Sequence, residues 1–378
     1  MQLIDLKLQY AALKSRIDAN IQNVLDSSQF IGGPFVQKLE IQLANFVDRK
    51  HCVTCANGTD ALQIAYMVLG VGPGDAVFCP DMTFISSVEP AKMLGAVPVF
   101  CDIMPDTYTL SPQSLVQQIE AVKAEGKLRP KAVVAVDILG NPCDYDAIVA
   151  VCEKYGLTLI EDAAQSMGAL YRGKRCGSFG QIATTSFFPA KPLGCYGDGG
   201  AIFLDDDELN KLCRSLCVHG KGSGGKYDNV RIGMNSRLDA IQAAVLLPKL
   251  EALEQYELKA RQDIAQRYND VFTEWFVTPF VAKDCVSVYA QYVLLAENNA
   301  QREKIVTHLT SQNIPNMVYY PTPQHRLPVF QSVPCYNEAF ATANDYCSRT
   351  FSLPMHPYLL PEDQEMVIHA VIEAIQPY

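Results

Sequence analysis

A chain of 378 residues is long enough to bury a large core and to form two or three domains. Its composition, 49% hydrophobic and 19% charged, is that of a folded globular protein and excludes a disordered chain. The net charge of −10, without a basic stripe, argues against broad nucleic-acid binding. The first residues do not form a secretory signal, and no apolar run reaches membrane-spanning length. We therefore expect a cytoplasmic protein that does not bind membranes.

The first 50 residues are predicted to form a helical arm. Apolar residues recur at helical spacing over residues 8–25, and the string Gly32-Gly33-Pro34 interrupts them. A second amphipathic helix is expected from Phe35 onward. Such an arm packs either on a partner subunit or on its own domain, and the sequence leaves both open.

Short apolar runs alternate with helical patterns from residue 51 to about residue 250. Strands are expected at residues 52–55, 76–79, 97–102, 132–139, 157–160, 183–188 and 201–204, and helices at residues 61–69, 87–94, 112–122 and 145–155. This alternation predicts an α/β domain with a mostly parallel central sheet flanked by helices. The last two strands are joined without a helix, which favours a local antiparallel pair.

The remainder of the chain is predicted to contain fewer strands. A helix at 207–218 and a glycine-rich loop at 219–226 precede one long helix at 238–272, in which Pro248 should introduce a kink. Residues 251–378 are expected to form a smaller C-terminal α+β domain. Its strands are predicted at 288–295 and 317–320, and its helices at 300–312, 338–349 and 361–375.

The thirteen cysteines are scattered through apolar segments, as expected of reduced, buried thiols. Cys52 and Cys55 form a Cys-x-x-Cys pair inside an apparent strand. A structural zinc site would need a second pair, so we expect no metal site.

A constrained lysine is the first candidate for chemistry. Lys191 lies between Pro189 and Pro192, directly after a predicted strand and before a glycine-rich turn. A lysine that forms a Schiff base needs an amine that is fixed in place and partly desolvated. A surface lysine in a hairpin loop fits the same residues.

Two further motifs precede this lysine. Gly58 and Thr59 open the first helix after the first strand, where free N–H groups form an anion site; an ordinary helix cap by Thr59 or Asp60 also fits. Asp162 ends a later strand, and the carboxyl ends of parallel strands line the ligand crevice. A carboxylate there suits the ring nitrogen of pyridoxal 5′-phosphate (PLP), although a turn or cap residue is the alternative.

Five strings, taken in order, resemble the DegT/StrS family of nucleotide-sugar aminotransferases, and the resemblance runs over nearly the whole chain. They are residues 56–62 (Ala-Asn-Gly-Thr-Asp-Ala-Leu), 161–166 (Glu-Asp-Ala-Ala-Gln-Ser), 186–191 (Ser-Phe-Phe-Pro-Ala-Lys), 197–200 (Gly-Asp-Gly-Gly) and 233–238 (Gly-Met-Asn-Ser-Arg-Leu). The resemblance implies a fold-type I PLP aminotransferase that acts as a homodimer with its active site at the subunit interface.

The resemblance also implies roles for individual residues. Lys191 would form the Schiff base, Asp162 would pair with the pyridine nitrogen, and Gln165 would lie near the ring hydroxyl. Phe84 matches the position whose ring stacks on the cofactor, although a core phenylalanine would also fit. The cofactor phosphate would be held by Gly58, Thr59 and Ser186, and by Asn235 of the partner subunit.

Within the family, residues 188–198, 286–292 and 352–358 most resemble aminotransferases that act on UDP-2-acetamido-2-deoxy-3-oxo-glucuronate. Arg237 would then lie near the sugar carboxylate, which its planar fork suits, although a salt bridge in the dimer interface is an alternative. Tyr320 carries over as a substrate residue, whereas Tyr319 stands where the family usually has histidine. The implied reaction is a ping-pong transfer from an amino-acid donor, glutamate.

Two alternatives remain open at this point. A C4 aminotransferase acting on a UDP-4-keto-6-deoxy-amino sugar would share every PLP residue. A regulatory protein that binds PLP or a sugar nucleotide without turnover would belong to a different class. A PLP-dependent sugar dehydratase is disfavoured, because such enzymes typically replace the Schiff-base lysine with histidine.

Overall fold

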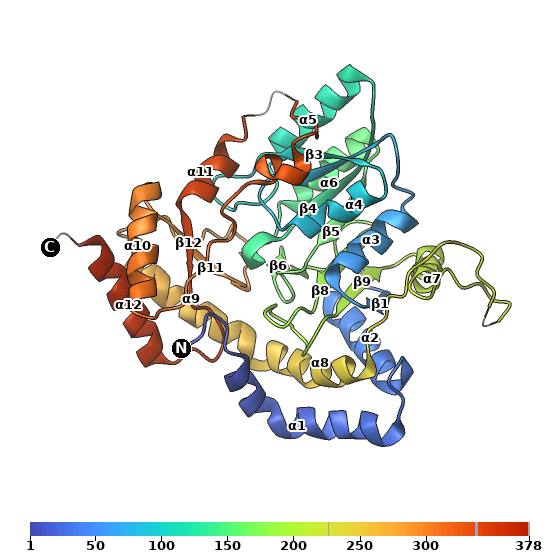
Figure 1. Cartoon of the computed structure of the whole chain (residues 1–378), viewed down its shortest axis with the longest axis horizontal. Helices are drawn as coiled ribbons and strands as arrows, with labels where there is room; N and C mark the ends of the chain where they lie inside the picture. Colours follow the sequence, from blue (N-terminus) through green and yellow to red (C-terminus); the bar gives the residue numbers. More distant parts are fainter. Residues whose placement is uncertain (226, 337–338, 377–378) are drawn as a thin grey trace.

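A seven-stranded sheet forms the centre of the molecule in the computed structural model, which describes residues 1–225, 227–336 and 339–376 (Figure 1). The strands follow the order β1-β9-β8-β5-β4-β2-β3. Their bounds are β1 His51–Cys55, β2 Asp75–Pro80, β3 Val97–Cys101, β4 Arg129–Val136, β5 Thr158–Asp162, β8 Ile182–Ser186 and β9 Gly200–Leu204. Only β9 is antiparallel to its neighbours, β1 and β8, within this sheet. The predicted mostly parallel sheet with a local antiparallel pair is confirmed.

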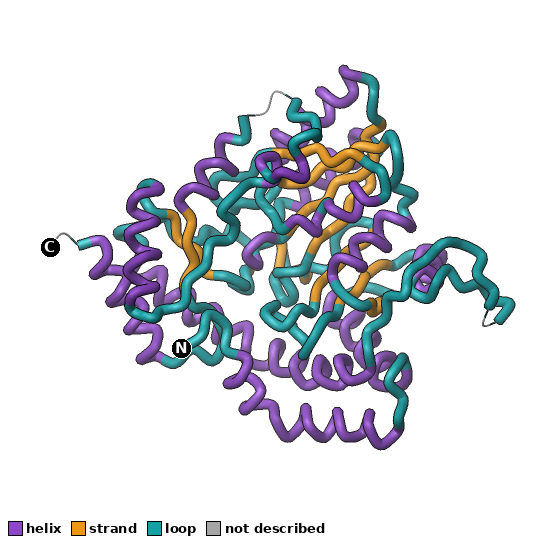
Figure 2. The backbone as a smooth tube through the Cα atoms, in the orientation of Figure 1, coloured by secondary structure: helices purple, strands orange, loops and turns teal. Residues whose placement is uncertain are grey.

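Helices cover both faces of this sheet because its strands are apolar on both sides (Figure 2). Along β9, for example, Ile202 and Leu204 face one layer of helices, whereas Ala201 and Phe203 face the other. The first layer contains α3 (Gly58–Val68), α4 (Glu89–Met93) and α7 (Asp207–Leu216). The second contains α2 (Gly33–Val47), α5 (Pro112–Glu125), α6 (Tyr145–Tyr155) and α8 (Ala240–Ala252).

Two strand ends differ from the prediction at the edge that holds the site. β8 stops at Ser186 instead of continuing to residue 188, because the Phe188 carbonyl turns back to accept a hydrogen bond from Lys191 N at 2.8 Å. β5 runs on through Asp162, since its last residues pair with β4 and β8. Glu161 and Asp162 therefore lie in the strand and not after it.

Two other predicted elements also differ from the prediction. The helix predicted at 87–94 is a 3₁₀ turn, η1 (Ile85–Ser87), followed by the short α4, whose first turn contains Pro90. The strand predicted at 132–139 is β4, which ends at Val136 and leads into a second 3₁₀ turn, η2 (Ile138–Gly140).

The long helix predicted at 238–272 is observed from α8 through η3 (Leu253–Glu257) to α9 (Leu258–Phe272). The α-helix continues through Pro248, and the departure from α geometry is the π turn η3, further along the chain. Proline cannot donate to the carbonyl four residues earlier. That carbonyl, on Ala244, accepts a hydrogen bond from Asn20 Nδ2 at 3.1 Å. Asn20 belongs to α1 (Leu6–Ser27), so the arm packs along α8 of its own chain.

A second, two-stranded sheet lies near the C-terminus, where β11 (Tyr292–Leu295) pairs with β12 (Thr350–Leu353). It shares a core with α9, α10 (Asn299–Ser311) and α12 (Pro361–Ile375). The predicted strand at 288–295 therefore begins later than expected, and the one at 317–320 makes a single bridge, Met317 to Ser352. α11 covers Ala341–Arg349. The start predicted for it at Glu338 lies outside the described residues, as does Lys226 in the predicted loop.

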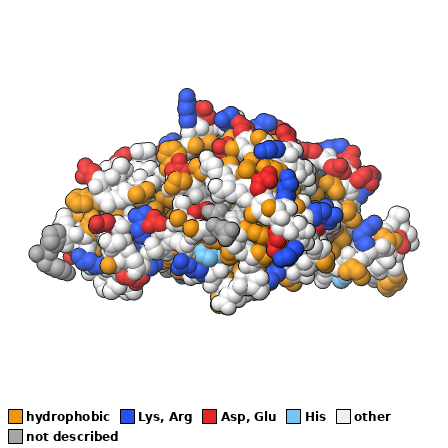
Figure 3. All heavy atoms as spheres, turned by 90° about the horizontal axis from the view of Figure 1, so that it is seen from above, with side chains coloured by type: hydrophobic (Ala, Val, Ile, Leu, Met, Phe, Trp, Pro, Cys, Tyr) orange, Lys and Arg blue, Asp and Glu red, His pale blue; other side chains and the backbone are white. Residues whose placement is uncertain are grey.

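A small three-stranded sheet, β10 (Cys285–Val286), β6 (Leu170–Tyr171) and β7 (Lys174–Arg175), completes the strands. The predicted boundary at residue 250 falls inside α8, and the division into an arm and two domains remains a prediction. Among the described helices, none has the length and apolarity needed to span a bilayer. Seen from above, acidic, basic and apolar side chains are interspersed over the surface (Figure 3).

Candidate active site

A cavity of about 660 Å³ lies where the carboxyl ends of β5 and β8 meet the start of α3. Eight of the ten residues predicted for the site line it: Gly58, Thr59, Phe84, Asp162, Gln165, Ser186, Lys191 and Tyr320. They come from five separate parts of the chain, and the parallel strands bring them to one edge of the sheet.

The start of α3 forms an anion-binding cradle. Asn57 caps the helix, because its side chain accepts a hydrogen bond from Asp60 N at 2.8 Å. The capping alternative for Thr59 and Asp60 is therefore wrong. The N–H groups of Gly58 and Thr59 precede the first intrahelical bond and so remain available to a ligand. A Cβ on Gly58 would lie 2.7 Å from the Ser186 Cβ, so glycine is required for this close approach.

Asp162 is held by two donors at the floor of the cavity. Its side chain is only 4% exposed. Ser87 Oγ donates to Oδ2 at 2.8 Å, and Ala164 N donates to Oδ1 at 3.2 Å. Burial raises the pKa of Asp162 above its usual range, although the Ser87 hydrogen bond opposes this effect. A cationic ring nitrogen would compensate this buried carboxylate, which is how it fits a pyridine cofactor.

Lys191 lines the same cavity and is not a surface lysine. Burial lowers the pKa of its amine below the ordinary value, and the charge of Asp162 opposes the shift. A lowered pKa increases the fraction of neutral, nucleophilic amine. The loop that carries Lys191 is compact: a Cβ on Gly194 would lie 2.4 Å from the Pro189 carbonyl oxygen.

Gln165, Tyr320 and Phe84 form another wall. Gln165 Nε2 donates to Tyr320 Oη at 3.3 Å, and Gln165 Oε1 accepts from Leu139 N at 2.5 Å. The Phe84 ring lies 6.3 Å from that of Tyr320, centroid to centroid. Since Phe84 is 54% exposed, it does not belong to the core and its ring is free to cover a ligand. Tyr319, which stands where the DegT/StrS family usually has histidine, also lines the cavity.

Ser87 is a functional residue that sequence reasoning missed. It orients Asp162, and it also contacts Thr83, whose Oγ1 lies 2.9 Å from Ser87 Oγ. The polar pair Ser86-Ser87, which follows the carboxyl end of β2 within a largely apolar stretch, was the available signal. Ser87 was instead assigned to the start of a helix.

Asn235 and Arg237 are the two predicted residues that do not line the cavity of their own chain. Arg237 Nη2 donates to Asn235 Oδ1 at 2.6 Å, and Asn235 is exposed. Both follow the loop that projects from the body of the molecule beyond α7 (Figure 1). Among the described residues that line the cavity, Lys191 is the one cation, whereas three are acids: Asp60, Asp162 and Asp198.

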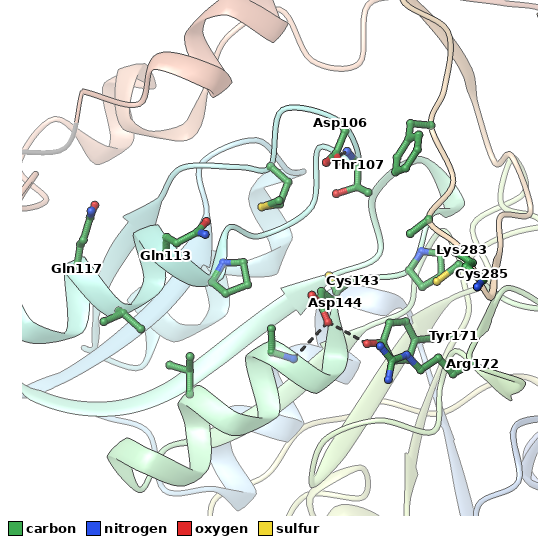
Figure 4. A pocket seen from close by; sticks show the side chains of 18 residues that line it. Asp106, Thr107, Gln113, Gln117, Cys143, Asp144, Tyr171, Arg172, Lys283 and Cys285 are labelled. Atoms are coloured by element: carbon green, nitrogen blue, oxygen red, sulfur yellow. Dashed lines mark hydrogen bonds between the residues drawn. The ribbon is translucent and has the colours of Figure 1, made fainter.

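A second cavity, of about 730 Å³, lies between α5, α6 and residues 280–285 (Figure 4). None of the ten predicted residues lines it. Some of its polar groups already have partners: Tyr171 Oη donates to Asp144 Oδ1 at 2.9 Å, and Arg172 pairs with Asp146, which lies outside the cavity. It contains no arrangement comparable to Lys191 with Asp162.

Three buried groups that could ligate a metal, Asp137, Glu161 and Cys176, also come together behind the site. Their carboxylates accept hydrogen bonds from the protein; Tyr145 Oη, for example, donates to Asp137 at 2.7 Å. Burial and the charge of Asp137 raise the pKa of Glu161 well above its usual range. A carboxyl pair of this kind holds a proton between its members, which fits a structural role.

Comparison with known proteins identifies the family. The sequence profile of the DegT/DnrJ/EryC1/StrS aminotransferase family matches residues 11–372. The chain belongs to this family. This aminotransferase is 46% identical over 360 residues to UDP-2-acetamido-2-deoxy-3-oxo-D-glucuronate aminotransferase of Pseudomonas aeruginosa. The alignment covers 95% of this chain and 96% of that protein.

Solved structures support the same assignment. The crystal structure of a DegT DnrJ EryC1 StrS aminotransferase from Brucella abortus matches with a TM-score of 0.95 and 44% identity, covering 99% of both chains. The NtdA protein of Bacillus subtilis, solved with bound cofactor PMP, matches with a TM-score of 0.86 and 27% identity, covering 99% of this chain and 83% of that one. The predicted family, fold class and PLP cofactor are confirmed, and the cradle, Asp162 and Lys191 fit that cofactor.

Proposed function

We propose that this aminotransferase transfers an amino group from glutamate to the 3-keto carbon of UDP-2-acetamido-2-deoxy-3-oxo-glucuronate, giving a UDP-3-amino-uronate for surface polysaccharide synthesis. The observation that carries the reaction is the pairing of Lys191 and Asp162 in one cavity with an anion cradle. The relative from Pseudomonas aeruginosa supports the substrate. Thirteen free cysteines, most of them buried, favour a reducing compartment, and we place the enzyme in the cytoplasm.

Each side chain of the cavity has a task in this reaction. PLP, when bound, supplies an electron-withdrawing ring and the carbon that carries the amino group between the two substrates. Gly58, Thr59 and Ser186 hold its phosphate, and Asp162 keeps the ring nitrogen protonated. The Lys191 amine takes the proton from the α-carbon of the amino donor and returns it on the cofactor side, first as a base and then as an acid.

The remaining residues orient and enclose the reactants. Gln165 would lie near the ring hydroxyl of bound PLP, and the hydrogen bond that Leu139 N donates to Gln165 Oε1 fixes its amide in one orientation. Phe84 covers one face of the ring and excludes water. Tyr320 lies beside both and contacts the sugar.

We propose that the second subunit of a homodimer completes the site. The substrate carries a diphosphate and a carboxylate, yet Lys191 is the one cation among the described residues that line the cavity. Arg237 and Asn235 lie outside that cavity, and Asn235 bridges back to Val218, where the loop after α7 begins. In this arrangement Arg237 of the partner subunit binds the sugar carboxylate with its planar fork.

The arrangement is tested by mixing two inactive variants. Lys191→Ala and Arg237→Ala homodimers should both lose turnover of the uronate. A hybrid dimer then contains one site with both Lys191 and Arg237, so co-folded mixtures should recover up to about a quarter of wild-type activity, since half of the dimers are hybrids and each has one intact site of two. Mixtures that stay inactive while hybrid dimers are present would contradict shared sites.

Substrate choice is tested separately with Arg237→Ala. Activity on the uronate should fall roughly 100-fold, because the variant loses the buried pair between Arg237 and the sugar carboxylate. Activity on an uncharged UDP-4-keto-6-deoxy sugar should not fall in this way, because that sugar has no carboxylate to pair. Arg172→Ala, in the other cavity, serves as the control. Equal losses on both sugars would remove the carboxylate assignment and favour the C4 reaction. A wild-type rate in Lys191→Ala would refute the aminotransferase chemistry itself.

A further inference from the structure

Two side chains of α8, Gln242 and Lys249, hold the backbone of the loop that carries Lys191. Lys249 Nζ donates to the carbonyl oxygen of Gly194. Gln242 exchanges two hydrogen bonds with Tyr196: Tyr196 N donates to Gln242 Oε1 at 2.8 Å, and Gln242 Nε2 donates to Tyr196 O at 3.2 Å. The two residues lie about two helical turns apart, on one side of α8.

Lys249 is unusual for its burial. Its side chain is 1% exposed, and its ammonium lies 4.8 Å from the centre of the Tyr196 ring. None of the ion pairs between described residues involves Lys249. Burial lowers the pKa of Lys249 to about 8, and the charge of Glu257 is the largest effect that raises this pKa. A buried cation without a carboxylate partner is costly, and an apolar side chain would fill this position at lower cost.

The contact with Gly194 leads directly to Lys191. Gly194 packs against the two residues that precede Ala190, since a Cβ on it would lie 2.4 Å from the Pro189 carbonyl oxygen and 2.7 Å from that of Phe188. The Phe188 carbonyl accepts the hydrogen bond of Lys191 N at 2.8 Å. A shift of Gly194 therefore changes the turn from which the Lys191 side chain enters the cavity.

We propose that Lys249 and Gln242 are positioning residues for Lys191. They fix the loop between β8 and β9 on α8, and so keep the Lys191 amine at the distance that proton transfer requires. The strong hydrogen bond that a cation makes to a carbonyl explains why a lysine occupies this buried position. This proposal rests on the proposed function of Lys191 and extends it to residues outside the cavity.

Lys249→Met tests the proposal, because methionine fills a similar volume without the charge or the donor. Lys259→Met, on the exposed side of α9, is the matched control. We expect kcat of Lys249→Met to fall roughly 10- to 100-fold with KM within about twofold, as for a small displacement of a catalytic group. The visible absorption of the cofactor bound to Lys191 should titrate roughly one pH unit away from wild type, because the environment of the amine changes.

A structural role alone would lower stability in urea and leave both kcat and the absorption titration at wild-type values, which would overturn the proposal. If Lys249→Met fails to fold, Gln242→Ala replaces it, because Gln242 is only half-buried. In this variant kcat and the absorption titration should change in the same direction as expected for Lys249→Met. Wild-type values in Gln242→Ala would then refute positioning. If the wild-type protein itself shows no cofactor band that changes with glutamate, the proposed function fails, which is a separate result.

Discussion

His356 makes the stability of this protein depend on pH between about pH 7 and pH 4. Its side chain is 3% exposed, and its Nδ1 has no hydrogen-bond partner within the part of the chain that the structure describes. Burial, assisted by the charge of Arg261, lowers the pKa of His356 from 6.5 to about 4. Between these two pKa values, His356 is therefore protonated in the unfolded chain and neutral in the folded chain.

The direction and the magnitude follow from this difference. A base with a lowered pKa in the folded state contributes stability that is present above about pH 6.5 and is lost as the pH falls toward about pH 4. Between about pH 7 and pH 5 the loss amounts to about 2 kcal/mol, and to at least about 1 kcal/mol if water screens the ring in part. His356→Met removes the titrating group, so its free energy of unfolding should not decrease by this amount on acidification.

Urea unfolding at a fixed protein concentration, at both pH values, measures the effect. The difference between the two free energies of unfolding should be smaller in His356→Met than in wild type by about 1–2 kcal/mol. His369→Met, on the exposed face of α12, should behave as wild type. The reasoning is refuted if wild type and His356→Met lose the same stability on acidification.

Two further substitutions test how the cavity holds PLP. Gly58→Ala introduces a Cβ only 2.7 Å from the Ser186 Cβ, so the affinity of the apoenzyme for PLP, measured by absorbance titration, should fall at least about tenfold. Gly72→Ala is the control, because the nearest atom to its new Cβ is 3.9 Å away and the affinity should not change. Equal affinities in the two variants would contradict the cradle. Ser87→Ala removes a hydrogen bond to the buried Asp162 worth about 1.5–3 kcal/mol, so it should weaken PLP binding roughly 10- to 100-fold. Ser348→Ala, in α11 and outside the cavity, should bind PLP normally. Unaltered binding in Ser87→Ala would show that Ser87 does not orient the carboxylate.

The sequence predicted that Lys191 and Asp162 belong to one site because their signal is local. Lys191 and Asp162 each follow or end an apolar strand, and parallel strands necessarily bring such ends to one edge of a sheet. The same reasoning located Gly58 and Thr59 at a helix start. These residues could be found without knowing any contact between distant parts of the chain.

The missed features depend on such distant contacts. Pro248 lies within a continuous helix because Asn20, in a different helix, satisfies the carbonyl that proline leaves free. The sequence predicts a helix at Ser87, because nothing near this residue in the sequence indicates its hydrogen bond to Asp162. In the proposed homodimer, Arg237 and Asn235 would reach the cavity of the partner subunit, and the sequence of one chain does not describe how two subunits pack.

The pairing of β1 with β9 has a consequence for how the protein is made. In the large sheet β1 lies beside β9, although β9 is synthesised long after it. A nascent chain that has not yet reached Gly200 therefore leaves β1 without a strand partner, and its apolar residues are open to chaperones and to aggregation. The contact of Gly58 with Ser186 also waits for this closure. The phosphate cradle at Gly58 can therefore be complete only after the chain has been synthesised through β9.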